Sequence, residues 1–217
     1  MTLVEHVLLI STKHLTEFAK QYKEAVNRYA KAHFENRSFH FTPNMIAISN
    51  NCASLIDNAL KFQKDYKKDD KNQIELDKAF SQVVSSFNSL KKQSIGYLIK
   101  EIFMDVDKEI SKVGSQEWLE GAASIIENVC LTLEDYFRDY IYLKESNADE
   151  LKVQLQKALA KAYIQAIMSR YAFYEGFVSA LFDIYFSVTR RCHYETNRIA
   201  NDTPTSASRR LASWTMP

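Results

Sequence analysis

Acidic residues in the second half of the chain have a spacing that metal-dependent chemistry could use. Asp105 and Asp107 lie two positions apart in the sequence FMDVDKE. Glu134, Asp135 and Asp139 then follow in the aromatic-rich sequence CLTLEDYFRDY. Carboxylates that line one cavity can hold Mg²⁺, which needs several hard oxygen ligands in octahedral geometry. One hypothesis is therefore a helical magnesium-dependent enzyme that uses Asp135 and Asp139.

The apolar residues around these acids indicate a different role. They recur every three or four positions, which places them on one face of a helix. This apolar stripe consists of Trp118, Ala122, Ile125, Val129, Leu133, Tyr136, Tyr140 and Leu143. Glu134 and Asp139 fall outside the stripe, so we expect the acids to be solvated. Tyr136 is expected to be buried, in which case Tyr136→Ala would cost about 3 kcal/mol of stability.

No other set of residues has the spacing of a catalytic or metal site. The five histidines are His6, His14, His33, His40 and His193, and none belongs to a Glu-x-x-His or His-Glu-x-x-His motif. The cysteines are Cys52, Cys130 and Cys192, which are odd in number and far apart. This pattern disfavours a disulfide framework or a zinc site and suits the reducing cytosol. The sequence therefore predicts no catalytic, cofactor-binding or metal-binding residue, and no cofactor.

The composition favours an all-α fold. The 217 residues include only 4 Gly and 3 Pro, and sheets with tight loops need such residues for their turns. Hydrophobic residues make up 46% of the chain and charged residues 25%, as in a folded soluble protein. The formal net charge of +1 lacks the basic excess typical of nucleic-acid binders. With so few glycines, a phosphate-binding loop is not expected, and neither is a small-molecule substrate.

The apolar periodicity predicts six helices separated by polar breaks. They cover approximately residues 3–33, 43–66, 76–90, 98–110, 115–143 and 147–170. Thr2, Thr42 and Ser115 are expected N-caps. The sequence KKQSIG, with Ser94 as a further candidate cap, is expected to separate the third helix from the fourth. Helices with one apolar face must pack together, and short connections favour antiparallel neighbours.

The first helix carries a heptad-like seam, because apolar residues recur every seven positions. The seam consists of Leu8, Leu15, Tyr22 and Tyr29, with Phe18, Ala25 and Ala32 as its companion row. We expect this seam to pack against the other helices.

Two segments are relevant to membrane contact. Residues 171–188, YAFYEGFVSALFDIYFSV, are mostly apolar, but Glu175 and Asp183 within them disfavour a membrane span. We interpret this segment as a buried or partner-facing helix. The run KFQKDYKKDDK, which includes Lys64, Lys67, Lys68 and Lys71, has five lysines and three aspartates. It is either a solvated helix end or a weak attractor of anionic lipid.

Several sequence blocks, taken together, resemble one protein family. GYLIKEIFMDVDKEI and EWLEGAASIIENVCLTLEDYFRDY are followed by KAYIQAIMSR, and FTPNMIAISNNC lies upstream. Their order and spacing resemble the C-terminal half of the exocyst complex component three family, whose wider membership includes a tumour-necrosis-factor-induced membrane-nanotube relative. The most specific element is Asp-Tyr-Phe-x-Asp at residues 135–139. The resemblance is best over residues 95–170, and the aromatic segment after Arg170 departs from it.

The resemblance implies elongated antiparallel helical bundles stacked into a rod, as in vesicle-tethering complex subunits. Residues 1–193 would form the helical bundle, and the polar residues 194–217 are expected to be a poorly ordered tail. The implied function is a non-enzymatic subunit of the exocyst, which tethers secretory vesicles to the plasma membrane before SNARE-mediated fusion.

The resemblance also implies partners and a location. Other exocyst subunits are the expected partners, with SNARE proteins and peripheral membrane contact as further candidates. The expected location is the cytoplasm, at plasma-membrane sites of secretion. A lipid-binding, membrane-remodelling relative of the exocyst subunit is the alternative.

Overall fold

The computed structural model describes residues 2–66 and 73–171, and these residues are almost entirely helical. The helices are α1 (Leu3–Glu35), α2 (Phe41–Asp65), α3 (Gln73–Ile110), α4 (Gln116–Asp139) and α5 (Glu145–Tyr171), with a 3₁₀ turn at Tyr140–Tyr142. No strand occurs within the described ranges. The predicted all-α fold is confirmed for this part of the chain, whereas the rod remains a prediction.

The chain divides into two compact units that are not continuous in sequence. The first combines Met1–Glu101 with Tyr142–Leu151. The second combines Ile102–Ile141 with the chain from Lys152 onward, of which residues 152–171 are described. The helix α3 therefore contributes its first part to one unit and its last turns to the other. The predicted single bundle over residues 1–193 stays a prediction.

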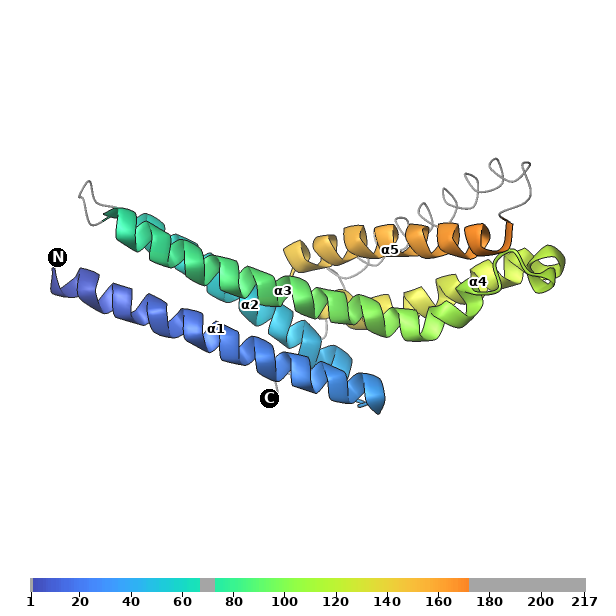
Figure 1. The fold of residues 1–217 in the computed structure, drawn as a ribbon, viewed down its shortest axis with the longest axis horizontal. Coiled ribbons are helices and arrows are strands. Elements are labelled where there is room, and N and C mark those ends of the chain that lie inside the picture. Colours follow the sequence, from blue (N-terminus) through green and yellow to red (C-terminus); the bar gives the residue numbers. More distant parts are fainter. Residues whose placement is uncertain (1, 67–72, 172–217) are drawn as a thin grey trace, which may run out of the picture. The chain divides into compact units, whose positions relative to one another are not determined.

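In the first unit, α1 and α3 run parallel, and α2 runs antiparallel to both (Figure 1). Lys23 donates to Ser89 at 3.0 Å. Further along both helices, Gln93 on α3 donates to Asn27 on α1 at 2.6 Å. Contacts that move in the same chain direction on α1 and α3 are those of parallel helices. The largest fully buried side chains of this unit are Phe41, Met45, Val83, Phe87, Leu90, Ile95, Leu98 and Leu151.

The segment from residue 142 to 151 joins this first unit through α2. The Asn50 amide donates to the Tyr142 carbonyl at 2.7 Å, and its Oδ1 accepts the Lys144 backbone N–H at 2.8 Å. Asn147, which is fully buried, donates from Nδ2 to the same Asn50 oxygen at 3.2 Å. One amide side chain therefore holds the connection that leads into α5.

The predicted seam of α1 is wrong in register, although its seven-residue spacing is right. The buried residues of α1 are Glu5, Thr12, Ala19, Val26, Ala30 and His33. Leu15 and Phe18 are instead 39% and 51% exposed. Polar side chains take part in the contact of α1 with α3, since Asn27 accepts hydrogen bonds from both Gln93 and Tyr97. The Phe18 ring, although half exposed, lies 6.4 Å from the ring of the buried Phe87 on α3.

In the second unit, the end of α3 packs with α4 and with the later part of α5. Tyr136 on α4 donates to Asp105 on α3 at 2.6 Å. Arg170, near the end of α5, donates to the Ser111 carbonyl at 3.1 Å. The buried residues include Ile102, Val106, Ile110, Val113, Trp118, Ile125, Val129, Leu133, Tyr140, Leu155, Leu159, Tyr163 and Ile167.

The predicted break between the third and fourth helices is wrong, because α3 continues through KKQSIG as one helix of 38 residues. The polar residues of this sequence have partners on neighbouring helices. Lys91 pairs with Glu150 at 3.0 Å, and Gln93 donates to Asn27. Ile95 and Leu98 are fully buried, so tertiary packing outweighs the roughly 1 kcal/mol that Gly96 costs a helix.

Smaller differences concern the helix ends and the kink of α4. Two predicted N-caps are confirmed: the side chain of Thr2 accepts from the Glu5 backbone, and that of Ser115 from the Trp118 backbone. The predicted caps at Thr42 and Ser94 are wrong, because α2 already begins at Phe41 and Ser94 lies inside the continuous helix α3. The helix α4 bends at Gly121, where φ is −151° and ψ is 36°. It ends in the 3₁₀ turn at Tyr140–Tyr142, so the predicted helix 115–143 is shorter than expected.

Some predictions fall outside the described residues. They are the aromatic segment 171–188 beyond its first residue, the tail 194–217, and Lys67, Lys68 and Lys71. Among the described helices, none is long and apolar enough to cross a membrane.

Candidate interaction surface

The acids singled out by the sequence do not converge on one site. Asp135 pairs with Arg138 at 3.0 Å within α4, and both side chains are more than 70% exposed. Asp107 and Asp139 are exposed, and Glu134 is half-buried. No group of three or more His, Cys, Asp or Glu side chains in residues 2–66 and 73–171 has the arrangement to hold a metal ion. The predicted solvated position of Asp135 and Asp139 is confirmed.

Tyr136 is not the core residue that the stripe predicted. The residue is half-buried, and its hydroxyl donates to Asp105 Oδ2 at 2.6 Å. The core position one turn later belongs to Tyr140, which is 4% exposed and lies 6.0 Å from the Tyr136 ring. A polar hydroxyl that bonds a surface carboxylate keeps its ring at the edge of the packed face.

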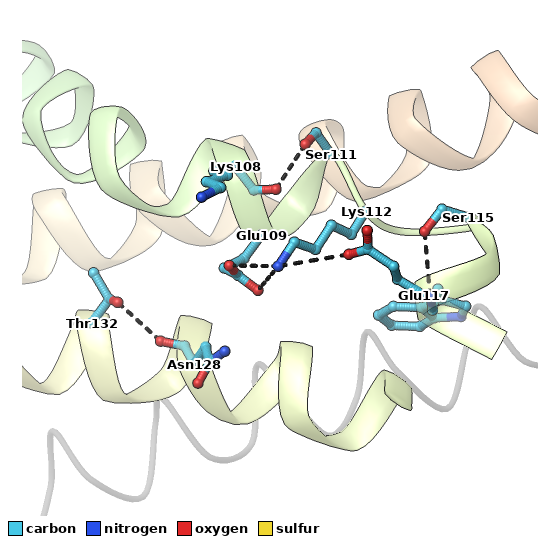
Figure 2. Close-up of polar contacts among 9 residues, drawn as sticks. Lys108, Glu109, Ser111, Lys112, Ser115, Glu117, Asn128 and Thr132 are labelled. Carbon is cyan, nitrogen blue, oxygen red and sulfur yellow. Dashed lines mark hydrogen bonds and ion pairs between the residues drawn. The ribbon is translucent and has the colours of Figure 1, made fainter. Parts of the chain in front are cut away.

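The turn between α3 and α4 holds a polar network in the second unit (Figure 2). Lys112 donates to both oxygens of Glu109, at 2.9 and 3.1 Å, and lies 3.9 Å from Glu117. The hydrogen bond from Lys112 lowers the pKa of the Glu109 carboxyl below its ordinary value, and partial burial opposes this. The same contact raises the pKa of Lys112. The network stabilises the turn and has no feature of a catalytic site.

The histidines and cysteines occupy structural positions. His6, His14 and His40 are exposed and His33 is buried, while His193 and Cys192 lie outside the described residues. Cys52 and Cys130 are buried. Burial raises the pKa of the Cys52 thiol to about 11, so the thiolate needed for nucleophilic attack is scarce at neutral pH.

The buried His33 joins α1, α2 and α3, an arrangement that the sequence did not predict. Its Nε2 lies 2.5 Å from Glu101 Oε2, and its Nδ1 accepts the Ser38 backbone N–H at 3.0 Å. The ring stacks on Phe41 with centroids 3.7 Å apart. His33 and Glu101 are 68 residues apart, and neither has a local motif, so no sequence signal could have paired them.

Several large apolar residues lie exposed on one side of the first half of α1, in the first unit. This surface, called here the α1 outer face, consists of Leu3, Val4, Val7, Ile10, Leu15 and Phe18, each between 39% and 80% exposed. Six large apolar residues within 16 positions exceed the scattered exposure usual on a helix. The arrangement suits contact with another apolar helix.

A shallow open depression of about 400 Å³ lies between α1 and α3. Its lining includes Thr12, His14 and Glu17 from α1 and Gln82 from α3. One histidine and one carboxylate on an open surface do not form an acid–base site, because nothing there excludes water or orients a substrate. The first unit thus offers a protein-binding surface more readily than a substrate pocket.

Comparison with known proteins agrees with this helical architecture. The sequence pattern of the family described as "Exocyst complex component Sec6" matches residues 2–176. "Exocyst complex component 3" of Drosophila melanogaster is 28% identical over 165 residues, which cover 75% of this chain and 22% of the relative. Its Caenorhabditis elegans namesake is 23% identical over 190 residues, covering 77% and 24% respectively.

One solved structure has the same fold. The C-terminal domain of the exocyst subunit Sec6p superposes with a TM-score of 0.62 at 14% identity, over 94% of this chain and 54% of that one. The long helices and the family match define the class as an all-helical member of an exocyst-component family. The chain belongs to the Sec6 family of exocyst components. It spans less than a quarter of the length of the curated relatives it matches.

Proposed function

We propose that this protein acts as a non-enzymatic exocyst subunit that helps tether secretory vesicles to the plasma membrane before SNARE-mediated fusion. The family match over residues 2–176 is the observation that carries this proposal. Other exocyst subunits are the proposed partners, and SNARE proteins and the membrane surface are further ones. The proposed location is the cytoplasmic side of the plasma membrane at sites of secretion.

The α1 outer face supports a role in protein–protein contact. Large aromatic and aliphatic side chains contribute most of the binding energy at interfaces, and Phe18 and Val7 are 51% and 52% exposed at its centre. Long helices also suit a scaffold, because a helix rises 1.5 Å per residue. The 38 residues of α3 would therefore span about 57 Å.

Affinity purification of the tagged full chain, followed by mass spectrometry, tests the proposal. Exocyst subunits should be recovered above the level of an untagged control. The variant Val7→Ser/Phe18→Ser should recover fewer of them while keeping its helical circular dichroism. A matched control, Leu131→Ser, changes a 53% exposed leucine on α4 and should leave recovery unchanged. Recovery of no exocyst subunit by the wild-type chain would contradict the proposal.

The lipid-binding alternative makes a different prediction. If a basic surface around Lys64, which is exposed at the end of α2, mediates membrane contact, the chain should float with vesicles that contain phosphatidylserine. It should not float with vesicles of phosphatidylcholine alone, and added salt should release it. Flotation without any exocyst recovery would favour this alternative.

The magnesium-dependent enzyme has the least support. Asp135 already pairs with Arg138, and Asp139 is exposed. Calorimetric titration with Mg²⁺ should therefore show no saturable heat. Millimolar or tighter binding that Asp135→Asn abolishes would revive the enzyme hypothesis.

A further inference from the structure

The buried contacts of His33 determine where its proton sits. A backbone N–H can only donate, so the Ser38 N–H at 3.0 Å requires an unprotonated Nδ1. The neutral imidazole therefore carries its proton on Nε2 and donates it to Glu101 Oε2. The His33 side chain is 1% exposed and that of Glu101 9% exposed, which shields the bond between them from water.

Ser38 is held on both sides in the turn between α1 and α2. Its N–H bonds His33, and its carbonyl accepts the Phe41 N–H at 3.2 Å. The N-cap residue of α2, His40, makes no side-chain hydrogen bond to the helix. The bond to His33 is thus one contact that fixes the turn before α2, beside the packing of the buried Phe41 ring, and the intervening Phe39 is fully exposed on this turn.

A second proton on His33 would affect its two polar contacts in opposite ways. The Nε2–H···Glu101 contact would gain charge assistance and strengthen. At Nδ1, however, the new N–H would point at the Ser38 N–H, and two donors repel each other. Stacking on Phe41, with planes 8° apart, is compatible with a cationic ring. Protonation would therefore release only the turn and leave the α1–α3 contact intact.

The other charged and titratable groups on the surrounding segments do not replace the lost bond. Glu35 on α1 is exposed, as are Arg37 and His40 on the turn, and the Arg37 guanidinium can only donate hydrogen bonds and so cannot accept the Ser38 N–H. Lys100 on α3 lies over the Phe34 ring at 3.9 Å. The Tyr97 hydroxyl donates to Asn27, and Tyr29 accepts from Asn44 on α2.

We propose that His33 is a proton-sensitive latch: its neutral form fixes the turn of residues 36–40 through Ser38, and its protonated form releases that turn and the exposed Phe39. The device is independent of the proposed exocyst function. It predicts a local change in the turn, with the helices of the first unit remaining folded.

Nuclear magnetic resonance of the full chain tests the latch directly. Long-range ¹H–¹⁵N spectra at neutral pH should show His33 protonated at Nε2 only. As pH is lowered through the His33 titration, hydrogen-exchange protection of the Ser38 amide should fall on the order of tenfold, the loss of about one hydrogen bond. The Asn36 amide, which bonds the Ala32 carbonyl at 2.9 Å, should keep its protection.

A substitution isolates the titrating group. In His33→Asn, the side-chain oxygen replaces Nδ1 as an acceptor and does not titrate, so Ser38 protection should become independent of pH. His14→Asn, at an exposed position on the same helix, should keep the wild-type response. If His33→Asn does not fold, the long-range spectra and the Ser38 exchange rates of the wild-type chain still test the proposal. An Nδ1-protonated tautomer, unchanged Ser38 protection through the titration, or no titration of His33 before unfolding would each overturn the latch.

Discussion

The first half of α1 and the helix α4 use their large apolar side chains in opposite ways. In α4, Ile125, Val129 and Leu133 are at most 5% exposed and form the inner side of the second unit. In α1, Val7 and Phe18 are about half exposed, while Thr12 and Ala19 are buried. Both helices are amphipathic, but only α4 buries its larger apolar residues.

This contrast shows that apolar area alone does not decide which face of a helix packs inward. The buried positions of α1 are mostly small or polar residues, and Asn27 finds hydrogen-bond partners on α3. The cost is an outer face of large apolar residues. Burial of that face against another helix would recover roughly 25 cal/mol per Å², which favours association.

The largest expected effect tests the contrast itself. Leu133→Ala in α4 should lower the free energy of unfolding by about 3 kcal/mol, because Leu133 is 1% exposed and leaves a cavity. Leu15→Ala in α1 should cost less than about 1 kcal/mol, since 39% of Leu15 is already exposed. Urea denaturation followed by circular dichroism measures both. Equal losses would mean that the two helices bury their leucines alike.

Tyr136 should behave as an edge residue of α4. Tyr136→Phe should cost about 1 kcal/mol by removing the hydrogen bond to Asp105. Tyr136→Ala should cost about 2 kcal/mol, less than a fully buried ring would. Tyr142→Phe, at a 73% exposed tyrosine, is the matched control and should be neutral. A loss above about 4 kcal/mol for Tyr136→Ala would restore the core assignment.

Two glycine substitutions compare a position inside the helix α3 with a position in the turn between α3 and α4. Gly96→Ala should raise the free energy of unfolding by about 0.5–1 kcal/mol, because an added Cβ meets no atom within 4 Å. Gly114→Ala should lower it by about 1 kcal/mol, since Gly114 has a φ of 77°. Thermal unfolding of the two variants provides the measurement, and shifts of the same sign would contradict the expectation.

The smallest effect concerns the Glu109–Lys112 pair. Because the pKa of Glu109 is lowered on folding, its stabilising contribution is present above 4.5 and is lost as pH falls through the folded value. The pKa of Lys112 is raised on folding, so its stabilising contribution is present below 10.5 and is lost as pH rises through the folded value. Lys112→Gln should move the pKa of Glu109 upward in a carboxyl ¹³C titration. Lys108→Gln should move it less, because Lys108 is the weakest contributor to that shift.

Much of the fold was predictable because helix formation depends on local periodicity. The predicted caps at Thr2 and Ser115, the stripe of α4 and the helical content are all present in the structure. The sequence could not show that the break predicted at KKQSIG is wrong. The residues that pair with this part of α3, Asn27 and Glu150, lie on other helices. The register of α1 depends in the same way on which helix it meets.

The site was predictable only in part. Exposure of Asp135 and Asp139 followed from their place outside the α4 stripe. The His33–Glu101 contact and the hydrogen bonds of Asn50 join residues 68 to 97 positions apart. Spacing within one helix carries no information about such pairs.

The docking of residues 142–151 onto Asn50 has a consequence for synthesis on the ribosome. The first unit lacks its final segment until 50 residues beyond Glu101 have been made, a delay of roughly 3–10 s at typical translation rates. During that interval α2 lacks the contacts that residues 142–151 make with it in the folded unit. Any truncation meant to isolate the first unit must therefore end after Leu151.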